Sequence, residues 1–268
     1  MDEQLNKGTK PGKMRIILIH GFGCGSADWS AQLDPFTHLA DVVAIDLPDQ
    51  GSTNYETGSL ISDMTEAVND VRRTIPPTRT VLVGHSMGCR VALEAARRMP
   101  EAVAGFVLIE GSLRAIGDPD EAVRRYQSRS VKENMALLKH DFAGMFSSAT
   151  PEAFQQLVLQ RIKTMGSEFA MQLMADMTWW DAGVAVGALQ AVQVPMLVVQ
   201  STYKEPGGER RPIKAQEMSP WLQLISEQAA DYADVIRLQG LGHFPQVEAP
   251  AVINDLIASF VGHLKLLH

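Results

Sequence analysis

Short apolar runs alternate along the chain with longer segments in which apolar residues recur at helical spacing. A continuous apolar run predicts a strand that is buried on both faces, as in a parallel sheet. Such runs occupy residues 14–19, 42–45, 80–83, 105–109, 194–199 and 235–238. Helices are predicted at 28–40, 59–74, 89–99, 221–230 and 252–267. This alternation predicts an α/β fold, with a doubly wound and mainly parallel sheet of about six strands and right-handed crossovers.

One long segment, residues 112–190, breaks this alternation. Its apolar residues recur at helical spacing, and it contains no clear strand. We therefore expect residues 1–111 to form the first part of the core, 112–190 an inserted helical cap, and 191–268 the second part of the core. Methionines recur in the insertion, and we interpret most of them as packing between its helices. Trp179 and Trp180 are better candidates for a pocket wall, because they lie just before the chain returns to the sheet.

Composition and charge narrow the class of protein. The chain has 268 residues, of which 46% are hydrophobic and 21% charged, so it can bury a sizeable core and shows no sign of disorder. The net charge of −7 argues against a nucleic-acid partner. Arginine pairs at 72–73, 97–98, 124–125 and 210–211 lie among acidic residues, and we interpret them as solvated helix faces.

Two further features bear on the compartment. Cys24 and Cys89 match neither a zinc spacing nor a redox C-x-x-C, so we expect reduced thiols and no metal. No apolar run approaches the ~18 residues of a membrane span, and the first seven residues contain no signal-like apolar stretch. We expect a cytoplasmic protein without a membrane partner, as a monomer or a homodimer.

The segment Gly84-His85-Ser86-Met87-Gly88 joins a predicted strand to a predicted helix. It matches G-x-S-x-G in the strand–turn–helix setting of a nucleophile elbow. A serine hydroxyl is a weak nucleophile, so the turn must hold it clear of neighbours, within reach of a base and beside backbone N–H donors. Gly84 and Gly88 suit this turn, because side chains there would collide with the adjoining strand and helix. Ser86 is therefore the candidate nucleophile.

Other candidate groups follow other predicted strands. Glu110 comes directly after the strand at 105–109, and ligands of such sheets bind beyond the carboxyl ends of the strands. His243 follows the last predicted strand, is flanked by glycine and lies near the end of the chain. The glycine-rich segment 20–26 follows the first strand and lets backbone N–H groups approach a ligand closely. It lacks the GK[ST] ending of a phosphate-binding loop.

The order of these features resembles the α/β-hydrolase superfamily over nearly the whole chain. The shared order is a glycine-rich loop, an elbow serine, an acid after a strand, a helical insertion and a late histidine. The resemblance implies Ser86 as nucleophile and His243 as general base, then as general acid toward the leaving group. It also implies an oxyanion hole formed by the backbone N–H groups of Phe22 and Met87.

The resemblance leaves two positions for the triad acid. Some relatives place it after the strand before the cap, which is Glu110 here, and many place it after the strand that follows the cap, where this chain offers Glu205 and Glu209. We favour Glu110, with Glu205 as the alternative, because the orienting group needs a rigid support and Glu205 lies in a Pro-Gly-Gly loop. The side chain of His85 should point away from the serine, and His85 is named with the two tryptophans as a candidate for lining the substrate pocket.

The resemblance implies a serine hydrolase without a cofactor. A serine at the elbow disfavours haloalkane dehalogenase and epoxide hydrolase chemistry, because those relatives carry an aspartate there. We expect cleavage of a carboxylic ester or lactone of an uncharged, largely apolar small molecule, through an acyl-enzyme on Ser86. Three alternatives stay open: a carbon–carbon bond hydrolase or a cofactor-free dioxygenase with the same triad, and a hydrolase-like small-molecule receptor.

Overall fold

The computed structural model describes residues 14–48, 59–74 and 79–266. Six parallel strands form one sheet in the order β2-β1-β3-β4-β5-β8. The strands are β1 (Met14–Ile19), β2 (Ala40–Ile45), β3 (Thr80–His85), β4 (Val103–Ile109), β5 (Met196–Gln200) and β8 (Ala233–Arg237). The predicted α/β fold with a parallel sheet of about six strands is confirmed, and each expected strand lies close to its expected position.

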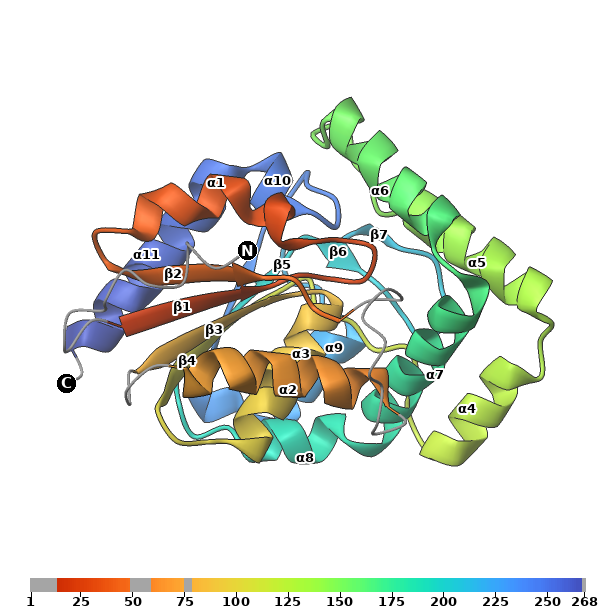
Figure 1. Ribbon diagram of the computed structural model, residues 1–268, viewed down its shortest axis with the longest axis horizontal. Coiled ribbons are helices and arrows are strands. Elements are labelled where there is room, and N and C mark those ends of the chain that lie inside the picture. Colours follow the sequence, from red (N-terminus) through yellow and green to blue (C-terminus); the bar gives the residue numbers. More distant parts are fainter. Residues whose placement is uncertain (1–13, 49–58, 75–78, 267–268) are drawn as a thin grey trace.

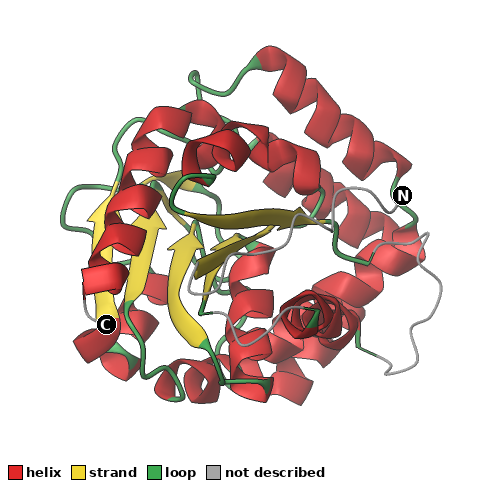
Figure 2. Ribbon diagram, turned by 60° about the vertical axis from the view of Figure 1, so that its left-hand side comes forward, coloured by secondary structure: helices red, strands yellow, loops and turns green. Residues whose placement is uncertain are grey.

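Helices cover both faces of the sheet (Figures 1 and 2). One face carries α2 (Leu60–Arg73), α3 (Met87–Arg98), α8 (Ala185–Gln190) and α9 (Pro220–Gln228), and the other carries α1 (Ser30–Leu33), α10 (Pro245–Glu248) and α11 (Pro250–Leu266). Successive strand residues point to opposite faces. In β1, Ile17 packs on the α3 side and Ile16 on the α11 side, and both are fully buried. Burial on both faces accounts for the continuous apolar run.

The chain between β4 and β5 is helical. Helices α4 (Pro119–Gln127), α5 (Val131–Ala143), α6 (Glu152–Thr164) and α7 (Ser167–Gly183) lie beyond one end of the sheet, on the right in Figure 1. Helix α8 then returns beside α3 and α9. Local signals fix where two of these helices begin, because Asp118 caps α4 and Ser130 forms a reciprocal capping box with Glu133 at the start of α5.

Two segments differ from their prediction. The helix expected at 28–40 consists of three short pieces, namely the 3-10 turn η1 (Ser26–Trp29), α1 and the 3-10 turn η2 (Asp34–Phe36). Pro35 is the reason, since it cannot continue an α-helical hydrogen-bond ladder. The polar loop expected at 200–211 contains an antiparallel ribbon of β6 (Thr202–Tyr203) and β7 (Arg211–Pro212), too short to produce a recognisable period. A third 3-10 turn, η3 (Ala230–Tyr232), precedes β8.

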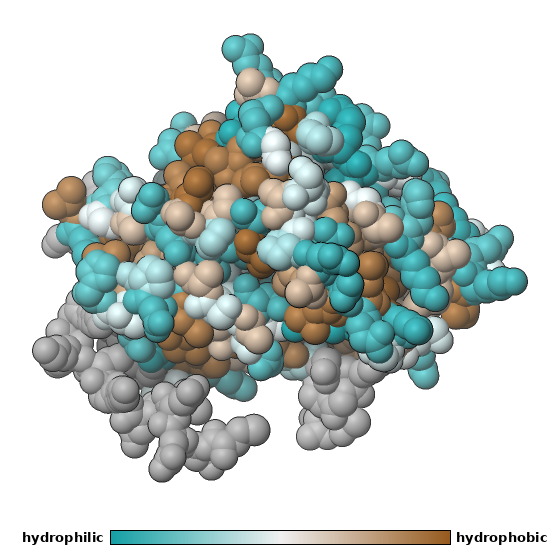
Figure 3. Space-filling model, turned by 90° about the horizontal axis from the view of Figure 1, so that it is seen from above, coloured by the Kyte–Doolittle hydropathy of each residue, from teal (hydrophilic) through white to brown (hydrophobic). Residues whose placement is uncertain are grey.

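The surface mixes hydrophilic and hydrophobic side chains, as Figure 3 shows for the face seen from above in Figure 1. Such a mixture is ordinary, because apolar atoms contribute more than half of the surface of most folded proteins. None of the described helices combines the length and the apolar character that crossing a membrane requires.

Candidate functional site

Ser86 occupies the sharp turn between β3 and α3. Its backbone has φ 54° and ψ −113°, a conformation that residues other than glycine rarely adopt. A Cβ atom on Gly84 would lie 2.4 Å from the carbonyl oxygen of Gly88, and one on Gly88 would lie 2.3 Å from the carbonyl oxygen of Ile19. The two glycines therefore allow β1, β3 and α3 to converge directly behind the serine.

Three side chains from distant parts of the chain meet at this turn. Ser86 Oγ lies 2.9 Å from His243 Nε2, and His243 Nδ1 lies 2.9 Å from Glu110 Oε2. An ionised carboxylate accepts hydrogen bonds and cannot donate them, so Nδ1 carries the proton that it donates to Glu110. Nε2 is then free to accept the hydroxyl hydrogen of Ser86. These are the contacts that a nucleophile, its base and an orienting acid require.

Glu110 directly follows β4 and is fully buried. Its Oε1 accepts hydrogen bonds from the backbone N–H groups of Ser201 and Thr202, the latter at 2.8 Å. Its Oε2 faces His243 and also lies 3.2 Å from Nη1 of Arg210. The backbone donors at the end of β5 hold the carboxylate in one orientation, and the guanidinium balances its charge.

The other acids considered from the sequence lie elsewhere. Glu205 is exposed and accepts a hydrogen bond from the hydroxyl of Tyr203 at 2.6 Å. Glu209 is also exposed and lies 3.6 Å from Nε2 of His140. Of these three acids, Glu110 is the one that contacts the imidazole of His243.

His243 lies in the loop after β8, and the segment after α5 fixes its backbone. The N–H of His243 donates to the carbonyl of Met145 at 2.8 Å. Burial lowers the pKa of His243 well below its ordinary value, and neighbouring cations, Arg210 first among them, lower this pKa further. The imidazole is therefore neutral near pH 7, which is the form that can accept a proton.

His85 contacts the backbone and the side chains of the loop after β8. Its Nε2 donates to the carbonyl of His243 at 2.7 Å, and its ring packs against Phe244 and edge-on to Trp29. Burial lowers the pKa of His85 to about 3, so the ring is uncharged. As expected, it makes no contact with the Ser86 hydroxyl, although it borders the cavity described below. Its contacts make it a positioning residue for His243.

The loop after β1 lies against the serine. A Cβ atom on Gly21 would lie 3.1 Å from Cβ of Ser86, so the loop approaches as closely as glycine allows. Phe22 and Met87 both border the cavity beside Ser86, and neither backbone N–H donates to another residue within the described ranges. Two such N–H groups, one of them at the start of α3, are suited to stabilising a negatively charged oxygen at Ser86.

A cavity of about 180 Å³, called the Ser86 cavity below, opens between the elbow and helices α4, α5 and α7. Apolar side chains form part of its wall, among them Met87, Leu138, Phe142, Met174 and Met177. Five basic residues also line it, namely Arg90, Arg114, Arg129, Lys204 and Arg210. Sequence patterning missed this basic lining, because its members are scattered over more than a hundred positions. No group of three or more side chains suited to holding a metal occurs among the described residues.

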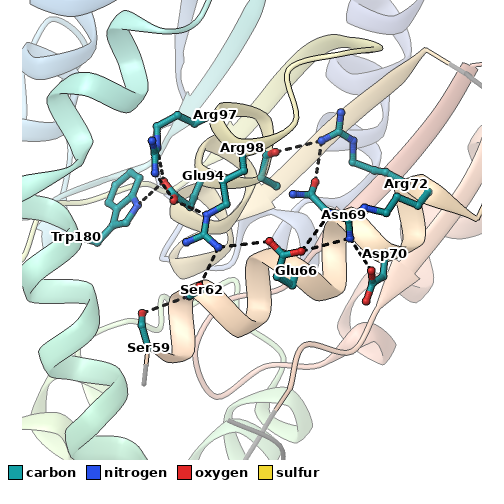
Figure 4. A network of polar contacts seen from close by, with 12 residues as sticks. Ser59, Ser62, Glu66, Asn69, Asp70, Arg72, Glu94, Arg97, Arg98 and Trp180 are labelled. Carbon is teal, nitrogen blue, oxygen red and sulfur yellow. Dashed lines mark hydrogen bonds and ion pairs between the residues drawn. The ribbon is translucent and has the colours of Figure 1, made fainter. Parts of the chain in front are cut away.

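Two arginines that were interpreted as solvated are buried. The side chain of Arg210 is 5% exposed, because it turns inward to pair with Glu110. Arg72 on α2 donates to Oδ1 of Asn69 at 2.8 Å (Figure 4). It also donates to the carbonyl oxygens of Ala95 and Glu101, at 3.2 and 2.7 Å. The carboxylate partner of Arg210 and the two carbonyl partners of Arg72 are distant in sequence, so local charge patterning gives no signal of burial.

The tryptophans expected in the pocket wall lie away from the Ser86 cavity, which corrects that expectation. Trp180 is buried against α3, with Nε1 3.5 Å from the carboxylate of Glu94 (Figure 4). Trp179 is 47% exposed and borders a separate hollow on the surface. Consecutive residues of a helix point about 100° apart, and α7 is turned so that Met174 and Met177 face the cavity instead.

Comparison with known proteins shows which family the chain belongs to. The family model described as "Alpha/beta hydrolase family" matches residues 16–256. The biotin biosynthesis bifunctional protein BioHC of Cellvibrio japonicus is 28% identical over 177 residues, which cover 60% of this chain and 34% of that protein. A pimeloyl-[acyl-carrier protein] methyl ester esterase of Methylococcus capsulatus is 35% identical over 108 residues, 39% of each chain. The alignments thus span little more than a third of these relatives.

A solved structure supports the fold independently. MenH from S. aureus superposes with a TM-score of 0.73 over 97% of each chain. Its sequence identity is 17%, so this likeness concerns the fold alone. Because the family model covers most of the sequence, the chain belongs to the alpha/beta hydrolase family.

Proposed function

We propose that the protein is a serine hydrolase that cleaves a carboxylic ester or lactone through an acyl-enzyme on Ser86. The observation that carries the proposal is the hydrogen-bonded series from Ser86 through His243 to Glu110, with both links 2.9 Å long. The methyl ester esterase among the relatives supports an ester as the substrate class.

In the first half-reaction, Ser86 Oγ attacks the carbonyl carbon while His243 Nε2 accepts the hydroxyl proton. The carbonyl oxygen becomes negatively charged and accepts hydrogen bonds from the N–H groups of Phe22 and Met87. Glu110 stabilises the imidazolium through Nδ1. When the intermediate collapses, the bond to the alcohol oxygen breaks, that oxygen takes the proton from Nε2, and the acyl group stays on Oγ.

In the second half-reaction, water replaces the alcohol. His243 Nε2 removes a proton from the water as its oxygen attacks the acyl carbon, and the same two N–H groups bind the oxyanion. Collapse breaks the bond to Ser86 Oγ, which regains its proton from Nε2. The products are a carboxylic acid and an alcohol, which remain one molecule when the substrate is a lactone.

Active-site labelling combined with turnover tests the proposal. A fluorophosphonate should label Ser86, as mapped by peptide mass spectrometry, and Ser86→Ala should abolish both labelling and hydrolysis of short acyl esters and lactones. Ser128→Ala, in an exposed turn after α4, is the matched control and should retain both. Absence of labelling together with absence of turnover would overturn the proposal, as would substrate-dependent oxygen uptake without ester cleavage.

A further inference from the structure

We propose that the Ser86 cavity binds an ester carrying a second, ionised carboxyl group, and that Arg114 is the main anchor of this carboxylate. The inference rests on the proposed hydrolase function and specifies its substrate class. It replaces the uncharged, largely apolar substrate expected from the sequence, because the cavity wall is rich in basic residues.

The basic residues of the cavity outnumber the carboxylates that contact them. Three have a partner, and the pairs are Arg90 with Asp181, Lys204 with Asp141 and Arg210 with Glu110. Arg114 and Arg129 form no ion pair with a described residue. This excess of positive charge lies in a protein whose net charge is −7, so it is a local property of the cavity.

Among the basic residues of the Ser86 cavity, Arg114 is the one with unused hydrogen-bond donors, one of them shielded from solvent, that a ligand could engage. Its Nε is shielded from solvent and has no hydrogen-bond partner among the described residues. The nearby carboxylate of Asp181 is already engaged, because each of its oxygens accepts a hydrogen bond of 2.7 Å from Arg90 and one of them also accepts the backbone N–H of Arg114. A guanidinium has five N–H donors and keeps its charge at any ordinary pH. The terminal nitrogens of Arg114 also donate no hydrogen bond to a described residue, so they are the donors that can reach a ligand in the cavity, and a bound carboxylate would supply the acceptors that this guanidinium lacks.

The chemistry of a guanidinium favours a carboxylate as this acceptor. Its planar fork matches the two oxygens of a carboxylate, which gives paired and directional hydrogen bonds. Leu138 and Phe142 on α5 and Met174 on α7 supply apolar surface in the same cavity for a short alkyl chain. Because Ser86 and Arg114 line one cavity of about 180 Å³, ester and carboxylate belong to one small molecule, such as the monoester of a short dicarboxylic acid.

Matched ester pairs test the inference. Monomethyl succinate, glutarate and adipate would be compared with methyl butanoate, pentanoate and hexanoate by measuring kcat/KM from methanol release. At least one charged ester should exceed its neutral counterpart by about tenfold or more, which corresponds to about 1.4 kcal/mol. Arg114→Gln should remove this preference by lowering kcat/KM for the charged esters to that for their neutral counterparts, and Arg114→Lys should keep part of it. Arg124→Gln, on the exposed face of α4, should leave the preference intact.

Thermal unfolding separates binding from a structural role and needs no turnover. Adipate should raise the Tm of the wild-type protein whereas adipamide should not, and Arg114→Gln should lose this rise while its own Tm equals or exceeds that of the wild type. No preference for charged esters, with neutral esters still hydrolysed, would overturn the inference and leave the proposed function standing. An unchanged preference in a destabilised Arg114→Gln variant would overturn it too, by making Arg114 structural. Failure of Ser86 labelling and of all ester turnover would instead refute the hydrolase function.

Discussion

Replacing Glu110 with glutamine should lower the rate of catalysis by several orders of magnitude, with little change in the shape of the site. In the wild type, Oε1 accepts the backbone N–H groups of Ser201 and Thr202, and Oε2 faces Nδ1 of His243. An amide has one oxygen and one NH2 group, and the backbone donors select the oxygen for the Oε1 position. The NH2 group then faces Nδ1, which can accept its hydrogen bond only after losing its own proton. That proton moves to Nε2, which can no longer accept the proton of Ser86.

The expected loss follows from two effects. The proton of His243 must return from Nε2 to Nδ1 before the reaction can start, and the imidazolium formed in the reaction has no carboxylate to balance its charge. Together these effects should lower kcat/KM by about 10³ to 10⁴, or about 4 to 5.5 kcal/mol of transition-state stabilisation. Arg210 also loses its carboxylate partner, and breaking a buried ion pair typically costs about 3 to 5 kcal/mol of unfolding free energy. Arg210 keeps its 2.6 Å hydrogen bond to Thr202 Oγ1, so the lower end of that range is expected.

Ester hydrolysis measured at pH 8 would check this prediction, with circular dichroism verifying that Glu110→Gln is folded at the assay temperature. Glu205→Gln is the matched control and should stay within about threefold of the wild type, because that exposed carboxylate bonds to the Tyr203 hydroxyl and not to His243. A folded Glu110→Gln variant within tenfold of wild-type activity would refute the assignment. So would a thousandfold loss in Glu205→Gln.

Two further predictions concern stability. Gly88→Ala should lower the unfolding free energy by about 3 kcal/mol or more, because its Cβ would lie 2.3 Å from a backbone oxygen. Gly262→Ala is the control and should raise the unfolding free energy by about 0.5 to 1 kcal/mol, because its Cβ would meet nothing within 4 Å and alanine favours a helix. Equal urea midpoints for the two variants would contradict this prediction. Burial lowers the pKa of His20, His85 and His243 in the fold, so the unfolded chain binds more protons than the native one below pH about 6.5. Stability should therefore be complete above that pH and fall by up to about 1.4 kcal/mol per pH unit for each histidine on acidification, and urea midpoints that stay constant from pH 8 to 4.5 would refute it.

The three side chains that meet at the elbow could be named from the sequence because local rules mark each of them. Ser86 lies between glycines that the turn requires, and Glu110 and His243 follow strands whose apolar runs are well defined. Parallel strands direct their carboxyl ends to one edge of the sheet, so these groups were expected to meet. The choice between Glu110 and Glu205 depended on the rigidity of the support, which the structure supplies through backbone N–H groups at the end of β5.

The lining of the cavity could not be predicted in the same way, because it depends on how helices are turned against the sheet. Nothing in the local sequence of α7 sets its rotation, so Trp179 and Trp180 were expected where methionines lie. Arg210 was assigned to the surface from its charged neighbours, whereas its partner Glu110 is a hundred positions away. Sequence periodicity reports which residues are buried in strands more reliably than which polar residues share a cavity.

The charges around His243 allow its imidazole to be neutral in one state of the reaction and cationic in another, and Arg210→Gln would test how they do so. The imidazole must be neutral before the reaction and cationic in the transition state. A carboxylate alone would raise the pKa of the imidazole and leave it protonated near neutral pH, whereas burial and Arg210 lower this pKa. Removing the guanidinium should therefore move the acidic limb of the kcat/KM profile to higher pH, with Arg124→Gln as a control that leaves the limb in place. Because Glu110 would keep its bonds from Ser201 and Thr202, activity above the limb should survive, and a limb that stayed fixed or moved to lower pH would refute this role of Arg210.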